Sequence, residues 1–219
     1  MTTVVFDFDG TLTVKSKNLW RRIWESLGYV TSENSYYRHL YADFLNKRIS
    51  HADWCKLTYQ AFKEGQLSES LFKDLVSNIT LKPETRGLLE TLHKSGCELH
   101  IVSGNIYEAI VQVLGDYASY FKSISANHLV FDNNGQLKEI VGTKYDFEGK
   151  AKFIEELCEK HNLKKQEVYF VGNGGNDEWV YLSGCKTICV TPDEDISADD
   201  IKKWNVKVEN LKKVIDLIG

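Results

Sequence analysis

Polar side chains that could take part in catalysis lie at the carboxyl ends of three predicted strands. Each strand is a short apolar run that gives way to acids, a hydroxyl or an amide. In a parallel sheet such strand ends meet at one crevice, where ligands bind, so groups about 170 residues apart in sequence can form one site. The set consists of Asp7, Asp9, Ser103, Asn173 and Asp177, with Lys150 reaching the same edge from the start of a helix.

These groups suit phosphoryl transfer with the help of a hard cation. Carboxylates and an amide oxygen, without thiolate or imidazole, are typical ligands of Mg²⁺. A carboxylate can also attack phosphorus and form an aspartyl-phosphate. Asp7 and Asp9 lie on one face of a strand end, so one can attack while the other protonates the leaving group. Ser103, Lys150 and turn N–H groups would hold the phosphoryl oxygens.

Strand-like and helix-like segments alternate along most of the chain, which predicts an α/β fold with a parallel sheet. The turn sequence Asn133-Asn134-Gly135 predicts a hairpin. Strands are expected at 3–8, 98–102, 124–126, 168–171 and 187–190, the hairpin at 128–141, and helices at 83–95, 105–114, 150–161, 178–182 and 211–218.

Residues 14–81 break this alternation, because helical stretches follow one another there without a convincing strand. The stretches are 17–27, 35–46, 51–63 and 68–77, with Ser50 and Ser68 as expected N-caps and Gly28 and Gly65 as expected stops. We therefore expect a helical cap domain over 14–81, inserted into a core formed by residues 1–13 and 82–219.

Composition limits the class of protein. The 219 residues are 42% hydrophobic and 26% charged, which is typical of a globular protein and not of a disordered one. The net charge of −4 argues against nucleic acid and anionic membranes as partners. No apolar run reaches the roughly 18 residues of a membrane span, and acids interrupt the N-terminal apolar stretch, so we expect no signal peptide. Five scattered cysteines without metal-site spacing favour a reducing, cytoplasmic location, and the oligomeric state stays open.

Four motifs in order carry a family resemblance. FDFDGTLT, IVSGN, Lys150 and GNGGND resemble the motifs of the haloacid dehalogenase superfamily. Their order and spacing are most similar to its phosphoserine-phosphatase-like branch with a helical cap of the C1 type. The resemblance covers nearly the whole chain. It implies a Rossmann-like three-layer core, with the small helical cap inserted after the first strand.

The resemblance also implies roles for the first two motifs. Asp7 would be the nucleophile and an Mg²⁺ ligand. Asp9 would be the general acid and base, and its backbone carbonyl would bind the metal. Thr11 would support the Asp9 turn beside the phosphate. Ser103 and the Gly104 amide would bind the phosphoryl group.

The remaining two motifs supply a cation and further metal ligands. Lys150 would neutralise the nucleophile and the phosphate, and we prefer it to Lys152 because it stands at the helix start, behind Gly149. Asp177 would orient metal-bound water as the second acid of its motif. Asn173 stands where the family usually has a metal-binding Asp. An amide oxygen can coordinate Mg²⁺ but brings no charge, so affinity should fall.

Three interpretations of Asn173 are open. The chain is a natural variant that works but needs more Mg²⁺, which we prefer because the other motif residues are all present. Alternatively, the residue is an engineered inactivating change, or the chain is a degraded protein that only binds its ligand.

The predicted cap does not favour phosphoserine as the substrate. Phosphoserine enzymes have an acid shortly after the first motif and a cap arginine, whereas residues 14–18 contain no acid and residues 53–57 no arginine. Aromatic side chains are mildly enriched in the cap, and we expect most of them to form its core. The alternative is an aromatic pocket wall, which would suit an amine such as choline. Its candidates are Trp20, Trp24, Tyr36 and Tyr37.

The resulting prediction is an Mg²⁺-dependent phosphatase that hydrolyses a small phosphorylated metabolite through an aspartyl-phosphate. The alternatives are a phosphotransferase or mutase of the same fold, and a catalytically weakened binding or regulatory protein. A phospho-receiver module is less favoured, because the long insertion between Asp9 and Ser103 would cover its aspartate.

Overall fold

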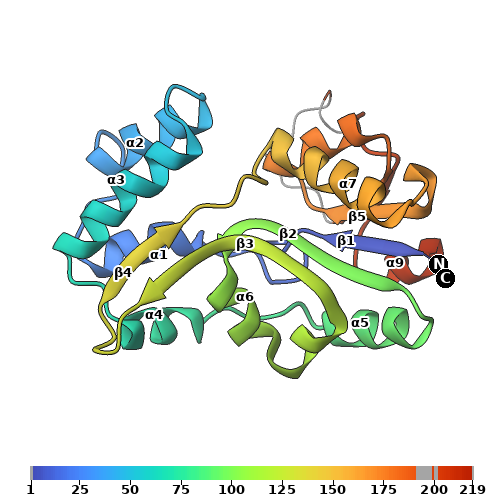
Figure 1. The fold of residues 1–219 in the computed structure, drawn as a ribbon, viewed down its shortest axis with the longest axis horizontal. Coiled ribbons are helices and arrows are strands. Elements are labelled where there is room, and N and C mark those ends of the chain that lie inside the picture. The colour runs from blue at the N-terminus through green and yellow to red at the C-terminus, as the bar shows by residue number, and fades with distance from the viewer. Residues whose placement is uncertain (1, 191–198, 200–201, 219) are drawn as a thin grey trace.

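A seven-stranded sheet forms the centre of the computed structural model, which describes residues 2–190, 199 and 202–218 (Figure 1). The strand order is β4-β3-β2-β1-β5-β6-β7. All neighbours are parallel except β3 and β4. This confirms the predicted α/β fold. The strands are β1 (Thr3–Phe6), β2 (Glu98–Ile106), β3 (Phe121–Phe131), β4 (Leu137–Val141), β5 (Val168–Gly172), β6 (Lys186–Val190) and β7 (Val206–Val208).

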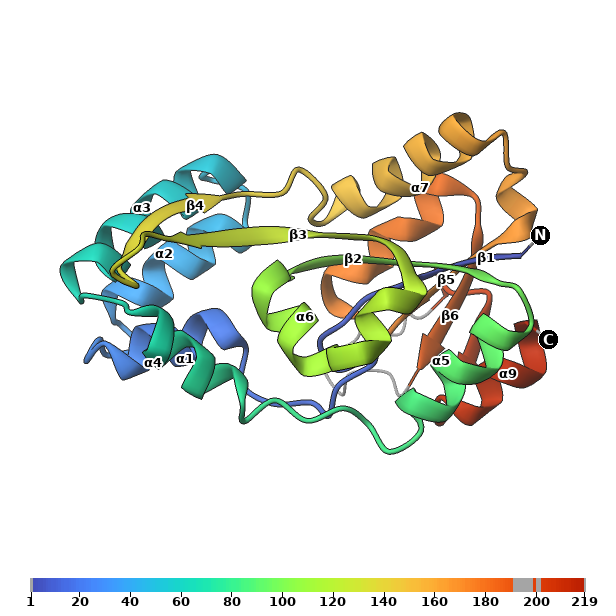
Figure 2. The ribbon, with the colours of Figure 1, turned by 60° about the horizontal axis from the view of Figure 1, so that its bottom comes forward.

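Helices cover both faces of the sheet, so β1 is buried on both sides. Val4 and Phe6 pack into one apolar cluster and Val5 into another, as the two-residue period of a strand requires. Figure 2 shows the helices of one face below the sheet and α7 above it. The first face carries α5 (Thr85–Lys94), α6 (Tyr107–Leu114) and α9 (Lys212–Ile218), and the second carries α7 (Glu148–His161) and the 3₁₀ helix η3 (Gly175–Ser183).

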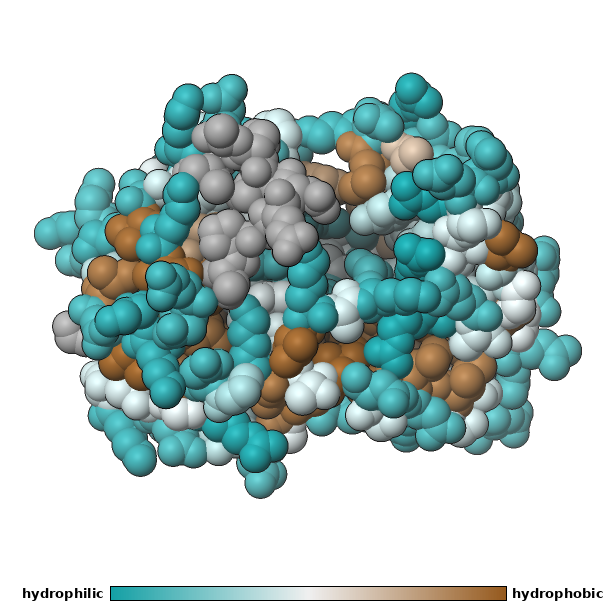
Figure 3. All heavy atoms as spheres, turned by 180° about the vertical axis from the view of Figure 1, so that it is seen from behind, coloured by the Kyte–Doolittle hydropathy of each residue, from teal (hydrophilic) through white to brown (hydrophobic). Residues whose placement is uncertain are grey.

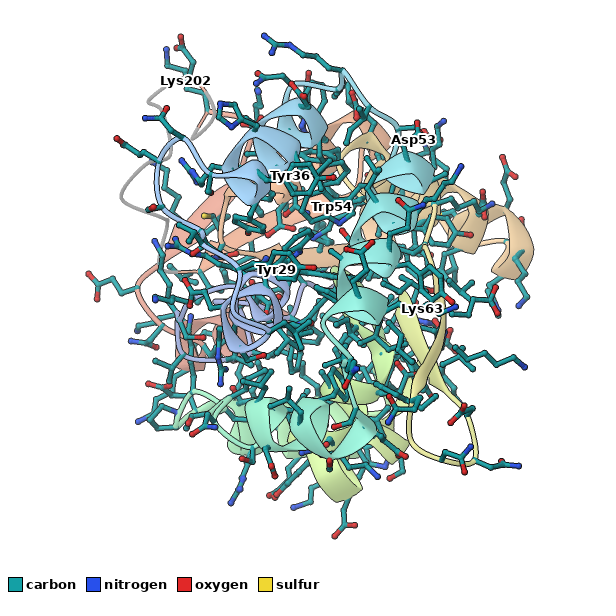
Figure 4. All side chains as sticks on the ribbon, turned by 90° about the vertical axis from the view of Figure 1, so that its left-hand side faces the viewer. Tyr29, Tyr36, Asp53, Trp54, Lys63 and Lys202 are labelled. Carbon is teal, nitrogen blue, oxygen red and sulfur yellow. The ribbon has the colours of Figure 1, made fainter. Side chains whose placement is uncertain are left out.

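The first four of the helices between β1 and β2, which we call the cap helices, form a third apolar cluster. Ser50 and Ser68 cap their helices as predicted, and Ser50 forms a reciprocal capping box with Asp53. Figure 4 shows Trp54 on α3 turned toward α2, where its ring stacks on Phe44. The cap helices are α1 (Leu19–Ser26), α2 (Tyr36–Leu45), α3 (His51–Glu64) and α4 (Glu69–Val76).

The β3–β4 hairpin joins the sheet to the cap helices. It extends beyond the parallel part of the sheet and lies beside α3 (Figure 1). Leu129 and Leu137 of the hairpin are buried in the apolar cluster of the cap helices. The sheet and the cap helices therefore both include this hairpin in their packing. The exact division into a cap at 14–81 and a core stays a prediction.

Several predicted elements differ from the observed ones. The strand predicted at 124–126 runs from Phe121 to Phe131, because β3 continues without a break into the hairpin. β2 continues through Ser103 and Gly104 to Ile106, beyond the predicted end at residue 102. The short strand β7 was not predicted. Of the acidic residues at 193–195 and 199–200, only position 199 lies within the described residues.

The surface is mostly hydrophilic, as expected when the apolar side chains pack between the layers. Hydrophilic residues cover most of the face seen from behind, and apolar residues appear between them in small groups (Figure 3). Among the described residues, no helix has both the length and the apolar character needed to cross a bilayer.

Candidate active site

The three central strands end side by side, as the sequence predicts. Phe6 of β1 pairs with Ile101 of β2 on one side and with Val171 of β5 on the other. The Asp7 N–H then donates to the Val171 carbonyl at 2.9 Å, which fixes the first acid just beyond the strand. A pocket of about 460 Å³ opens at this edge, between the strand ends and the cap helices.

Lys150 lies under the pocket between two acids. Its Nζ is 2.7 Å from Asp7 Oδ1 and also donates to Asp177 Oδ1. The side chain is fully buried, which alone would lower its pKa, but the charges of Asp177 and Asp7 outweigh burial and raise the pKa above its usual value. Lys150 is therefore a permanent cation against Asp7. Lys152, the alternative in the sequence, is exposed.

Asp177 uses both carboxylate oxygens within the protein. Oδ1 accepts from Lys150, and Oδ2 accepts from the Asn173 N–H at 3.1 Å. Burial, followed by the charge of Asp7, raises the pKa of Asp177 above the usual range of a carboxyl group. In this arrangement Asp177 orients Lys150 and the loop after β5. Its predicted contact with a metal would depend on an intervening water.

Asp9 lies at the pocket wall and is held by a residue that the sequence analysis missed. Asn105 Nδ2 donates to Asp9 Oδ1 at 2.8 Å. Burial and the neighbouring charge of Asp7 raise the pKa of Asp9 to about 7, although the Asn105 bond opposes the shift. A carboxyl group with such a pKa can give and take a proton near neutral pH, as a general acid and base must. The position of Asn105, directly after IVSG, was the available signal.

Thr11 and Gly10 arrange the other side of Asp7. The Thr11 hydroxyl lies 3.3 Å from Asp7 Oδ2 and 3.3 Å from Asn173 Oδ1, so both oxygens converge on it. Gly10 has a φ of 72°, and a Cβ there would lie 2.5 Å from Asn173 Nδ2. The turn therefore requires glycine. Thr11 contacts Asp7 and Asn173 directly, in addition to any support that it gives to the turn.

The oxygen donors at this point fit a hard cation. Asp7 Oδ2 and Asn173 Oδ1 face one another across the Thr11 hydroxyl, and the Asp9 carbonyl follows within the same turn. Within the described residues no three acidic, His or Cys side chains gather into a metal-type group. An ion here would consequently depend on amide and main-chain oxygens as well as on carboxylates, which suits Mg²⁺ better than a softer metal.

Ser103 and Gly104 lie across the pocket from Asp7. Ser103 is 1% exposed, and its Oγ accepts the Asn105 N–H at 3.2 Å, so its own proton is available to a ligand. Both residues line the pocket. The structure thus brings the predicted phosphate-binding groups to the same cavity as the predicted nucleophile.

The cap helices supply an aromatic wall. Trp20, Tyr41, Phe44 and Trp54 line the pocket, together with Phe147 from the loop before α7. Of the four candidates named from the sequence, Trp20 alone lines it. Trp24 and Tyr37 are buried among the cap helices, and Tyr36 is 58% exposed. The expected packing of cap aromatics into a core thus describes Trp24 and Tyr37, and the alternative of a pocket wall applies to Trp20 among the four.

Two further polar residues of the pocket were missed. Asp146 lies close to Gly104, and its Oδ1 accepts bonds from the Asn176 side chain and the Phe147 N–H. Asn176 belongs to the GNGGND motif, so its position was visible. Asp146 stands in a loop whose sequence gives no comparable signal.

Known proteins with related sequences place the chain in a family. A family model described as haloacid dehalogenase-like hydrolase matches residues 1–179. The chain belongs to this family. It is 30% identical over 111 residues to a phosphoserine phosphatase of Lactococcus lactis, a match that spans 51% of this chain and 50% of that protein. It is 25% identical over 209 residues to inorganic pyrophosphatase 2 of Arabidopsis thaliana, spanning 90% of this chain and 68% of that protein.

Solved structures show the same fold. A structure described as a phospho-aspartyl intermediate analogue of phosphoserine phosphatase superposes with a TM-score of 0.76, over 100% of this chain and 99% of that one, at 17% identity. The family and the phosphoserine-phosphatase-like fold that the motifs predicted are thus confirmed. The chain matches only about half the length of the Lactococcus relative.

Proposed function

We propose that this chain is a Mg²⁺-dependent phosphatase that hydrolyses a small phosphorylated metabolite through a phosphoryl group on Asp7. One observation carries the proposal. Asp7 has its Oδ1 held by the buried Lys150 at 2.7 Å and its Oδ2 turned toward the Thr11 hydroxyl and Asn173 Oδ1. This carboxylate is therefore held in one orientation beside a cation, as a nucleophile requires.

The steps follow from the residues around the pocket. Asp7 attacks the phosphorus while Asp9, which carries a proton below a pKa of about 7, protonates the departing oxygen. Ser103 and the Gly104 N–H hold the phosphoryl oxygens. Water then attacks the aspartyl-phosphate, and Asp9 takes its proton. When bound, Mg²⁺ would be held by Asp7, Asn173 and the Asp9 carbonyl and would offset the phosphoryl charge.

The pocket lining bears on the class of substrate. Among the residues that the structure describes there, none is a lysine or an arginine, although Lys150 lies buried beneath. Among the described lining residues, a substrate carboxylate would meet no lysine or arginine on the cap side. Arg21 and Arg22 of the cap bond elsewhere, with Glu25 and with the Leu75 carbonyl. We therefore expect a phosphate ester whose leaving group lacks a carboxylate, so phosphoserine is a poor substrate although several relatives are phosphoserine phosphatases.

Phosphate release across a Mg²⁺ titration tests this function. The substrate is p-nitrophenyl phosphate, and the matched variants are Asp7→Asn and Lys152→Met, the second on an exposed lysine outside the pocket. We expect release that depends on metal, is lost in Asp7→Asn and is unchanged in Lys152→Met. A stable phosphorylated protein without release would indicate a transferase instead, and metal binding without turnover would indicate a binding protein.

A further inference from the structure

Asn127 of β3 is a buried amide that lies between the cap helices and the segment of β2 that carries Ser103, Gly104 and Asn105. It is 0% exposed, and all four of its hydrogen-bonding positions are filled. Nδ2 donates to the Gly104 carbonyl at 2.7 Å and to the Asn105 carbonyl at 3.1 Å. Oδ1 accepts the Thr143 N–H at 2.9 Å and faces His51 Nε2 at 2.8 Å.

The partners fix which way this amide points. The Thr143 N–H can only donate and the two carbonyls can only accept, so a flipped amide would oppose like groups on both sides. It follows that His51 Nε2 carries the proton that it shares with Asn127 Oδ1. A buried amide whose four positions are all filled in this way has a single low-energy orientation.

Two of these bonds reach the catalytic groups through one residue each. The Gly104–Asn105 peptide is planar and trans, so holding its carbonyl on one side directs the Asn105 N–H to the other side, where it meets Ser103 Oγ. The bond to the Asn105 carbonyl fixes the residue whose side chain holds Asp9. One amide thereby sets the position of the phosphate-binding hydroxyl and of the acid.

The cap helices contact the same segment of β2. Trp20 Nε1 from α1 donates to the Gly104 carbonyl at 3.0 Å, beside the bond from Asn127. His51 at the start of α3 contacts the other end of the Asn127 amide. Trp20 and His51 both line the pocket, and both contacts lead to the segment that carries Ser103 and Gly104, the second through Asn127.

We propose that Asn127 is a positioning residue that couples the position of the cap helices to the alignment of Ser103 and Asp9. This inference rests on the proposed phosphatase function. It assigns no contact with substrate to Asn127. The cap helices and the β2 segment with Ser103 and Gly104 are coupled because both bond to one amide, which can satisfy its partners in only one orientation.

Leaving-group dependence separates this role from a purely structural one. Asn127→Ala removes all four bonds, whereas Asn127→Asp keeps the acceptor for Thr143 and His51 and replaces the two donors by an oxygen that opposes the Gly104 and Asn105 carbonyls. Asn205→Ala is the control, because its Oδ1 accepts the Thr187 N–H at 2.8 Å far from the pocket. Each protein is assayed with p-nitrophenyl phosphate, whose leaving group departs without a proton, and with phenyl phosphate, whose leaving group needs one.

Misplacing Asp9 should slow the second ester more than the first. For both Asn127 variants we expect kcat/KM to fall about tenfold further on phenyl phosphate than on p-nitrophenyl phosphate. Binding of inorganic phosphate, measured by thermal shift with Mg²⁺ present, should also weaken, while Asn205→Ala should change stability alone. Equal losses on the two esters, or phosphate binding as tight as that of Asn205→Ala, would overturn the inference. No release from either ester by the unsubstituted protein would refute the proposed function instead, and the phosphate-binding comparison would still decide the role of Asn127.

Discussion

Replacing Asn173 by aspartate tests the least usual feature of the site. The substitution Asn173→Asp changes one amide nitrogen to oxygen and adds a negative charge, with almost no change of shape. Without metal the new charge would face Asp7 across the Thr11 hydroxyl. With Mg²⁺ bound the same charge becomes favourable. We therefore expect opposite effects on the metal-free and the metal-bound protein.

The structure sets the size of the effect. Asp7 Oδ2 and Asn173 Oδ1 are each 3.3 Å from Thr11 Oγ1, so they are at most about 6.6 Å apart. Two negative charges at that separation repel by about 2.5 kcal/mol at an effective dielectric constant of about 20. If bound Mg²⁺ removes only this repulsion, the affinity for the ion rises about 60-fold in the variant.

Two assays measure this change. Thermal unfolding in EDTA and in excess Mg²⁺ should show the variant less stable than the unsubstituted protein without metal and at least as stable with it. Phosphate release should reach half its maximum at a Mg²⁺ concentration lower by one to two orders of magnitude. An unchanged half-maximal concentration would show that Asn173 does not set the metal affinity and would refute the placement of the ion beside it.

Three other predictions follow from buried titratable groups. Lys150→Met should lower the free energy of unfolding at pH 8 by about 3 to 5 kcal/mol, because both of its carboxylate partners lose their cation, and chemical denaturation measures this. Burial raises the pKa of Asp9 to about 7, so the unfolded chain ionises at a lower pH than the folded protein and stability falls as the pH rises toward 7. Asp9→Asn should therefore gain stability relative to the unsubstituted protein as the pH rises from 5 to 7 in EDTA, and a difference independent of pH would contradict the shift. Burial raises the pKa of the Cys55 thiol to about 12, so an aromatic disulfide reagent should modify the half-buried Cys97 first, which peptide mapping would show.

Much of the site could be predicted because its residues directly follow apolar strands. Asp7, Ser103 and Asn173 each come at or just after a short buried run, and a parallel sheet brings such positions to one edge. The four cap helices were equally visible, since capping residues such as Ser50 and stops such as Gly65 mark their ends. Local signals of this kind depend little on tertiary packing.

The supporting residues could not be predicted in the same way. Asn127 lies in the middle of a long strand, and its four partners come from three separate segments. Tyr41 and Phe44 have the same helical spacing as the buried aromatics around them, and only the packing of α2 against α3 decides which rings face the pocket. Sequence pattern indicates that a side chain is buried against something, but not against what.

The identity of the nucleophile is the central claim, and trapping the phosphorylated protein tests it most directly. The protein is mixed with p-nitrophenyl phosphate and Mg²⁺, quenched in acid within its turnover time, digested and analysed by mass spectrometry. We predict one alkali-labile phosphoryl group on the peptide that contains Asp7, and none in Asp7→Asn. A phosphoryl group on another residue, or metal-dependent phosphate release that survives in Asp7→Asn, would contradict the account.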